Sequence, residues 1–123
     1  MSQLKRVFYL PNCDTSKRVI KEARLGDDFD FQDIKKKPLT PQQLDELAVM
    51  AGSYEALFSR RSREYQKREL KNEYLNEKDY RDLILEHYSF LKRPVVVYAG
   101  QAFVGSSEKV VNQLINELEK EQP

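Results

Sequence analysis

The chain has 123 residues, and its 21 Lys and Arg residues are balanced by 20 Asp and Glu residues, which leaves a formal charge of +1. A charge so close to zero produces no long-range field that would draw nucleic acid or an anionic membrane. No apolar run approaches the roughly 18 residues needed to cross a bilayer. A chain of this length buries roughly two-thirds of its unfolded surface, so we expect one domain over residues 1–123.

The number of cysteines and the first residues of the chain indicate in which cellular compartment the protein is expected. The chain has one cysteine, Cys13, which cannot form an intramolecular disulfide. Residues 1–6 lack the apolar core of a secretory signal. We therefore expect a protein of the reducing cytoplasm.

The first third of the chain predicts a strand, a helix and a second strand. The apolar run 7–10 is nearly continuous, which is typical of a strand covered on both faces. Apolar residues at helical spacing predict a helix over 14–24, with Gly26 as a left-handed stop. Residues 29–34 alternate apolar with polar, as in a strand with one face in water. Such a unit joins parallel strands by a right-handed crossover.

The middle of the chain predicts helices. Thr40 begins a capping box with the glutamine three residues later, and a proline occupies the first helical position. Residues 59–74 are rich in charges of both signs, which favours short helical pieces and loops. Asn76 is a further cap, and its helix is expected to run to about His87. We thus expect a helical insertion at about 40–90.

The last third predicts a hairpin and a helix. The segments 95–98 and 101–105 flank an Ala-Gly dipeptide, which is a hairpin signature. Ser106 or Ser107 then caps an amphipathic helix. The order β-α-β, helices, β-β-α indicates an α/β protein.

Cys13 is the residue that could act as a nucleophile. It begins the first predicted helix, where unpaired N–H groups and the peptide dipoles favour thiolate over thiol. Lys17 and Arg18 add positive charge nearby, whereas Asp14 opposes them. Ser16 either donates a hydrogen bond to the thiolate or bonds within the first helical turn. From these residues alone, a nucleophile and a small buried hydrophobe both stay open.

Two motifs carry a resemblance to a known family. They are Asn-Cys-Asp-Thr at 12–15 and Leu-Lys-Arg-Pro-Val-Val-Val at 91–97, the latter followed by Val-Gly at 104–105. Together they resemble the arsenate reductase (ArsC), Spx and YffB family, and the first motif is closest to the YffB branch. The resemblance spans essentially the whole chain and implies a thioredoxin-like fold with a mixed sheet and a helical insertion.

The resemblance also implies roles for single residues. Cys13 would attack an oxyanion or thiol substrate, and Arg93 and Arg61 would stabilise its negative charge. Arg61 matches the family better than its neighbour Arg60, but their adjacency leaves open which one faces the thiol. The proline of thioredoxin-like folds that corresponds to Pro94 is cis, close to the cysteine. The predicted substrate-binding residues are Asn12, Asp14, Thr15, Ser16, Arg60 and Pro94.

Three departures from the family pattern bear on function. Arsenate reductases carry a third arginine in an Arg-Pro pair after the last strand, where this chain has Gly-Ser-Ser-Glu at 105–108. The Cys-x-x-Cys switch of Spx-type regulators ends here in Ser16. The usual His-Pro is replaced by His87-Tyr88, which leaves the conformation of the local turn open. A lone histidine at a helix end is usually structural or exposed rather than a base.

These residues leave three functional hypotheses. The first is a thiol-dependent reductase related to arsenate reductase, with glutathione or a small glutaredoxin-like protein resolving the Cys13 adduct. The second is an Spx-like module that binds a protein such as RNA polymerase without catalysis. The third is an arsenate reductase whose missing arginine is replaced by another cation, for example Lys109. No bound cofactor, metal or membrane partner is expected, and Glu64 and Glu69 interrupt the one basic cluster that would favour nucleic acid.

Overall fold

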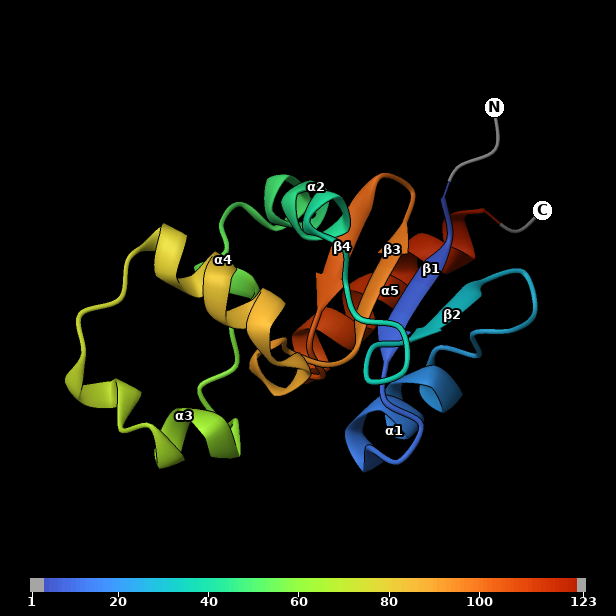
Figure 1. Ribbon diagram of the computed structural model, residues 1–123. Coiled ribbons are helices and arrows are strands. Elements are labelled where there is room, and N and C mark those ends of the chain that lie inside the picture. The colour runs from blue at the N-terminus through green and yellow to red at the C-terminus, as the bar shows by residue number, and fades with distance from the viewer. Residues whose placement is uncertain (1–3, 122–123) are drawn as a thin grey trace. The chain divides into compact units, whose positions relative to one another are not determined.

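The computed structural model describes residues 4–121, and the chain divides into two compact units (Figure 1). The first unit extends to Ile34 and resumes at Arg93. The second unit is Lys35–Lys92, which contains the whole range of about 40–90 where a helical insertion is expected.

The first unit contains a four-stranded mixed sheet in the order β2-β1-β3-β4. Its central strand β1 pairs in parallel with β2 and antiparallel with β3, and β3 pairs antiparallel with β4. The parallel pair is the one that the β-α-β pattern predicts. The strands are β1 (Arg6–Tyr9), β2 (Asp30–Asp33), β3 (Val95–Tyr98) and β4 (Gln101–Val104).

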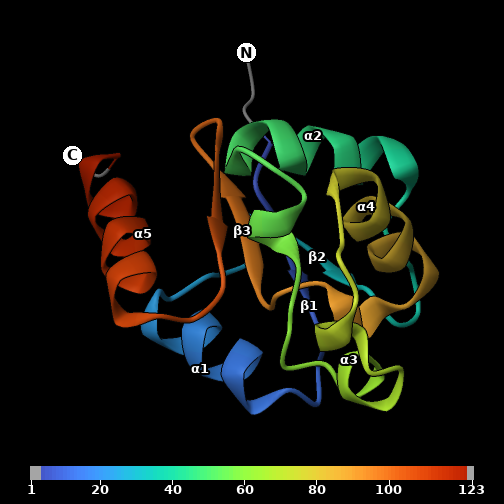
Figure 2. The same ribbon diagram turned by 90° about the vertical axis from the view of Figure 1, so that its left-hand side faces the viewer.

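Helices α1 (Asp14–Glu22) and α5 (Glu108–Lys120) lie on the same side of this sheet (Figure 2). The apolar face of each helix packs against side chains that alternate along the strands. The helical spacing of apolar residues and their alternation in the strands therefore build one hydrophobic core. Ser107 caps α5 by accepting from the N–H of Val110, at 3.2 Å. The buried residues of this core are Val7, Ala23, Leu25, Phe29, Val96, Tyr98, Phe103 and Leu114.

Strand β1 confirms the prediction of a strand covered on both faces, because the adjacent Val7 and Phe8 are both buried. Strand β2 differs from its predicted alternation. Phe31 is 39% exposed, whereas Gln32 is buried and accepts a hydrogen bond from Arg6 at 3.4 Å. The reason is that β2 is an edge strand, where Phe31 packs edge-on against the ring of Tyr9 at the margin of the sheet.

The end of α1 also differs from the prediction. The helix ends at Glu22, and the left-handed residue that follows is Arg24, at φ 53°, rather than Gly26. In contrast, the hairpin is confirmed. Ala99 and Gly100 both have positive φ, at 54° and 72°, as a tight turn matching the twist of the strands requires.

The second unit is built from helices with the predicted caps. Thr40 and Asn76 each form a capping box with the residue three positions later. Around the buried Phe58 gather the rings of Tyr65, Tyr80 and Phe90. The helices and 3₁₀ turns are α2 (Pro41–Ala51), η1 (Glu55–Leu57), α3 (Arg63–Lys67), η2 (Leu70–Asn72), α4 (Glu77–Glu86) and η3 (Tyr88–Phe90).

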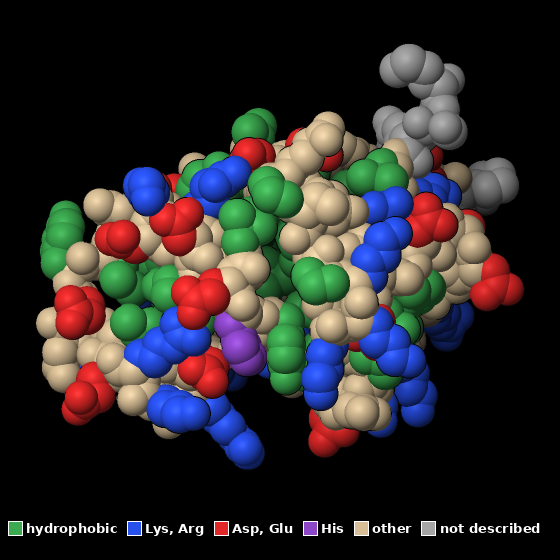
Figure 3. Space-filling model, viewed as in Figure 1, with side chains coloured by type: hydrophobic (Ala, Val, Ile, Leu, Met, Phe, Trp, Pro, Cys, Tyr) green, Lys and Arg blue, Asp and Glu red, His purple; other side chains and the backbone are tan. Residues whose placement is uncertain are grey.

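The surface view agrees with the near-neutral charge. On the face shown in Figure 3, acidic and basic side chains are interspersed rather than gathered by sign. Among the described helices, none has the length and apolar character needed to span a bilayer.

Candidate functional site

Cys13 is the N-cap residue of α1, directly after the turn that follows β1. Its backbone is extended, and its N–H donates to the carbonyl of Leu10 at 3.1 Å. Its own carbonyl accepts the first helical hydrogen bond, from Lys17 at 3.0 Å. These two bonds fix the half-buried sulfur beside the first free N–H groups of the helix.

Ser16 lies one turn further along α1 and is completely buried. Within residues 4–121 its hydroxyl has no hydrogen-bond partner of standard geometry, so it does not bond within the first turn. It is nevertheless close enough to Cys13 to stabilise the ionised sulfur. A buried hydroxyl without a partner is unfavourable, and a neighbouring thiolate supplies the missing acceptor.

Arg93 approaches Cys13 from the segment before β3, the strand that lies beside β1. Val95 of β3 pairs with Phe8 of β1, so this antiparallel register brings the residues before β3 beside the end of β1. The Arg93 side chain is half-buried and hydrogen-bonds the Cys13 sulfur. The predicted pairing of these two residues is thus present within the first unit.

The environment of the sulfur changes its ionisation. Burial raises the pKa of Cys13, but the hydrogen bond from the Ser16 N–H, the nearby Ser16 hydroxyl, and the hydrogen bond and charge of Arg93 together outweigh it. The pKa of Cys13 is therefore below its ordinary value. A lowered pKa gives more thiolate at neutral pH, and the thiolate is the nucleophilic form.

Pro94 has the cis peptide bond that the resemblance implies. It is buried, and its carbonyl accepts from the N–H of Gly105 at 2.9 Å. Of the other residues predicted beside the thiol, Asn12 and Asp14 are exposed and Thr15 is half-buried. All three lie within two residues of Cys13 along the chain.

Arg60 and Arg61 belong to the second unit and differ in their surroundings. Arg60 donates to the carboxylate of Glu55 and to the hydroxyl of Tyr80, each at 2.9 Å. Its guanidinium also lies 5.7 Å from the centre of the Tyr80 ring. Arg61 is exposed and makes no hydrogen bond or ion pair with any residue that the structure describes. Arg61 is therefore the arginine left available for an external anion.

The loop after β4 is the place where arsenate reductases carry a third arginine. In this chain the basic residues near that loop are Arg18 and Lys109. Arg18 of α1 donates to the carbonyl of Ser106 at 2.9 Å and pairs with Glu22 at 3.2 Å. Lys109 is exposed in the first turn of α5. Across residues 4–121 no group of three or more His, Cys, Asp or Glu side chains is arranged to hold a metal ion.

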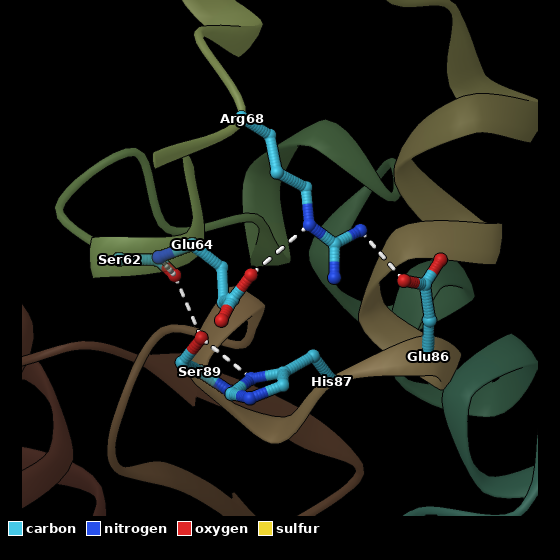
Figure 4. A network of polar contacts seen from close by, with 6 residues as sticks. All are labelled: Ser62, Glu64, Arg68, Glu86, His87 and Ser89. Carbon is cyan, nitrogen blue, oxygen red and sulfur yellow. Dashed lines mark hydrogen bonds and ion pairs between the residues drawn. The ribbon is translucent and has the colours of Figure 1, made fainter. Parts of the chain in front are cut away.

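One polar network was not predicted from the sequence. Figure 4 shows His87, Ser89 and Ser62 joined by short contacts, beside an ion-paired cluster of Arg68 with two glutamates. The sequence predicts a structural or exposed role for His87. No spacing rule joins it to Ser62, because the two come from opposite ends of the α3–α4 segment.

Comparison with known proteins identifies relatives of the chain. The model of the ArsC family matches residues 8–114. No curated protein sequence matches the chain. The β-α-β and β-β-α halves with their mixed sheet form a thioredoxin-like fold, as the resemblance implies.

Several solved structures share this fold. A structure titled YFFB protein is 23% identical, with a TM-score of 0.74 over 90% of this chain and 98% of that chain. An arsenate reductase (ArsC) related protein from Brucella melitensis is 27% identical, with a TM-score of 0.66 over 89% and 92%. An arsenate reductase from Vibrio cholerae is 18% identical, with a TM-score of 0.70 over 93% and 98%.

Proposed function

Since the chain belongs to the ArsC family, we propose that it is a thiol-dependent oxidoreductase that uses Cys13 as its only nucleophilic sulfur. The observation that carries this proposal is the set of donors around Cys13. Ser16 and Arg93 both lower the pKa of the thiol and overcome the effect of its burial. A cysteine with only a packing role would show the effect of burial alone.

The first step is a thiol–disulfide exchange. The Cys13 thiolate attacks one sulfur of a mixed disulfide between glutathione and a substrate thiol. A bond forms between Cys13 and the glutathione sulfur, the original S–S bond breaks, and the substrate leaves as a thiolate that takes a proton from water. Arg93 stabilises the negative charge on sulfur before and after this exchange.

The second step needs a thiol from outside the chain, because Cys13 is the only cysteine. A second glutathione, or a small glutaredoxin-like protein, attacks the glutathione sulfur of the adduct. Glutathione disulfide leaves when glutathione is the attacking thiol, and Cys13 returns as a thiolate. Glutathione is thus a co-substrate rather than a bound cofactor.

Arg61 is proposed to bind the negative charge of the substrate. Its availability supports this role, because Arg60 is held by Glu55 and Tyr80 while Arg61 is not. A guanidinium suits this task because its planar set of donors matches a carboxylate. The γ-glutamyl and glycyl carboxylates of glutathione offer such groups.

The arsenate hypothesis has less support. The position of the third arginine is replaced by Gly-Ser-Ser-Glu, and Arg18 in this region is committed to Ser106 and Glu22. The hypothesis of an Spx-like regulator that binds RNA polymerase has no specific observation in its favour. A cytoplasmic location fits a free thiolate and stays a proposal.

The experiment is a measurement of the Cys13 adduct and its turnover. The protein is incubated with glutathione disulfide and analysed by intact mass, and a gain of one glutathione on Cys13 is expected within minutes at neutral pH. Added reduced glutathione should remove it and regenerate the thiol. Cys13→Ser is the control and should gain no mass. Failure of the parent protein to form the adduct would overturn the proposal.

A further inference from the structure

We propose that Cys13 carries a second activity, the reduction of hydrogen peroxide and other small hydroperoxides through a sulfenic acid on its sulfur. This activity rests on the proposed function only for its later steps, in which glutathione returns the sulfur to the thiolate. The residues that carry it are Cys13, Ser16 and Arg93, which all belong to the first unit. The peroxide site therefore lies within one compact unit.

The buried hydroxyl of Ser16 is the observation that points to an oxygen atom on the sulfur. Ser16 is completely buried, and within residues 4–121 its hydroxyl has no hydrogen-bond partner of standard geometry. A hydroxyl has one proton to donate and two lone pairs to accept with. A thiolate takes the proton of the nearby Ser16 but has none to give back. The O–H of a sulfenic acid on Cys13 supplies that donor, so the oxidised sulfur satisfies the buried hydroxyl more fully.

Arg93 is placed to stabilise the oxygen that leaves. Its side chain hydrogen-bonds the Cys13 sulfur, and its charge acts on the same atom. When a thiolate attacks a peroxide, negative charge moves from the sulfur to the far oxygen. A fixed positive charge beside that oxygen lowers the barrier, because it needs no rearrangement during the reaction. The sulfur is half-buried, which leaves it within reach of a molecule as small as hydrogen peroxide.

The first step is a two-electron oxidation of the sulfur. The Cys13 thiolate attacks one oxygen of hydrogen peroxide, an S–O bond forms and the O–O bond breaks. The far oxygen leaves as hydroxide and takes a proton from solvent to become water. Cys13 is left as a sulfenic acid. The chain has no second cysteine that could convert it into an intramolecular disulfide, so it persists until an external thiol arrives.

The next two steps use glutathione as the reductant. One glutathione thiol attacks the Cys13 sulfur, an S–S bond forms and the sulfenic oxygen leaves as water. A second glutathione attacks the glutathione sulfur of this mixed disulfide, which releases glutathione disulfide, a proton and the Cys13 thiolate. One peroxide and two glutathione molecules thus give two waters and one glutathione disulfide. The mixed disulfide is the same adduct that the proposed function contains.

The test compares hydrogen peroxide with iodoacetamide at one pH. Both reagents are neutral and both react with the thiolate, so the ratio of their second-order rate constants cancels the thiolate fraction. In the parent protein this ratio should exceed that of free glutathione about tenfold, because donors aimed at developing charge act on the peroxide oxygen. Dimedone, which reacts with sulfenic acids, should add one molecule to Cys13 after peroxide treatment, as measured by intact mass.

Three variants identify the groups responsible. Ser16→Ala and Arg93→Met should each lower the ratio about three- to tenfold, the effect of one hydrogen bond to a charged group. Lys17→Ala is the matched control, because it removes an exposed positive charge of α1 and leaves both donors in place. It should leave the ratio unchanged. Circular dichroism identifies any variant that does not fold, and the remaining donor variant then decides the question.

The outcomes separate this activity from the proposed function. A parent ratio no higher than that of glutathione, or a ratio that neither donor variant lowers, would overturn the peroxide activity. If glutathione disulfide still forms the Cys13 adduct in that case, the proposed function stands alone. If dimedone labels Cys13 after peroxide but glutathione disulfide forms no adduct, the proposed function fails and the oxidation step stands. A parent protein that reacts with neither oxidant refutes both.

Discussion

The hydroxyl of Ser16 is completely buried one helical turn after Cys13 and stabilises the ionised form of its sulfur. The position has a simple origin. Cys13 is the N-cap of α1, so the residue three positions later faces back toward it. This is the position where a Cys-x-x-Cys motif has its second cysteine. The serine there cannot form a disulfide, but it supplies a hydrogen-bond donor to the thiolate.

The first prediction concerns that donor. Ser16→Ala should raise the pKa of Cys13 and slow its alkylation by iodoacetamide about three- to tenfold at neutral pH, because one hydrogen bond to a charged group is lost. The rate measured against pH gives the pKa directly. Thr15→Ala removes a neighbouring hydroxyl and should have little effect. Equal pKa values for Ser16→Ala and the parent protein would show that the hydroxyl has no role in ionisation.

A second prediction concerns Arg93. Arg93→Met should raise the pKa of Cys13, because both a hydrogen bond and a positive charge disappear. Arg93→Lys keeps the charge and should restore part of the effect. In the parent protein, added salt should raise the pKa of Cys13 slightly by screening Arg93, and this salt dependence should be weaker in Arg93→Met. An identical salt response in the two proteins would argue against a charge interaction.

The third prediction links ionisation to folding. The pKa of Cys13 is lower in the folded chain than in the unfolded chain, where it is about 8.5. The resulting stabilisation is complete above the unfolded pKa and is lost as the pH falls through the folded pKa. The free energy of unfolding of the parent protein, relative to Cys13→Ser, should therefore rise with pH up to about 8.5. Urea unfolding at a series of pH values measures it, and a flat difference would contradict the lowered pKa.

The fourth prediction addresses the second unit. Phe58 is fully buried and contacts the rings of Tyr65, Tyr80 and Phe90. Phe58→Ala should cost about 3–5 kcal/mol of stability, the range for removing a buried aromatic ring. Val49→Ala is the matched control, because Val49 is 83% exposed and its loss should change stability by less than about 0.5 kcal/mol. Chemical unfolding monitored by circular dichroism measures both.

The sequence by itself determined the features that depend on neighbouring residues. Three of these features follow from local backbone chemistry. They are the capping boxes at Thr40 and Asn76, the turn at Ala99-Gly100 and the position of Cys13 at a helix start. Their signals lie within a few residues, so one chain is enough to find them. The family motifs extended this to the fold, because they specify which strands are neighbours.

Tertiary structure alone decided the features that depend on strand register and packing. The exposure of Phe31 and the burial of Gln32 follow from the edge position of β2, which alternation cannot reveal. The commitment of Arg60 to Tyr80, and the polar network from His87 to Ser62, join residues distant in sequence. Side-chain hydrogen bonds of this kind leave no periodic trace, because they depend on where whole elements pack, and packing is set by the complete chain.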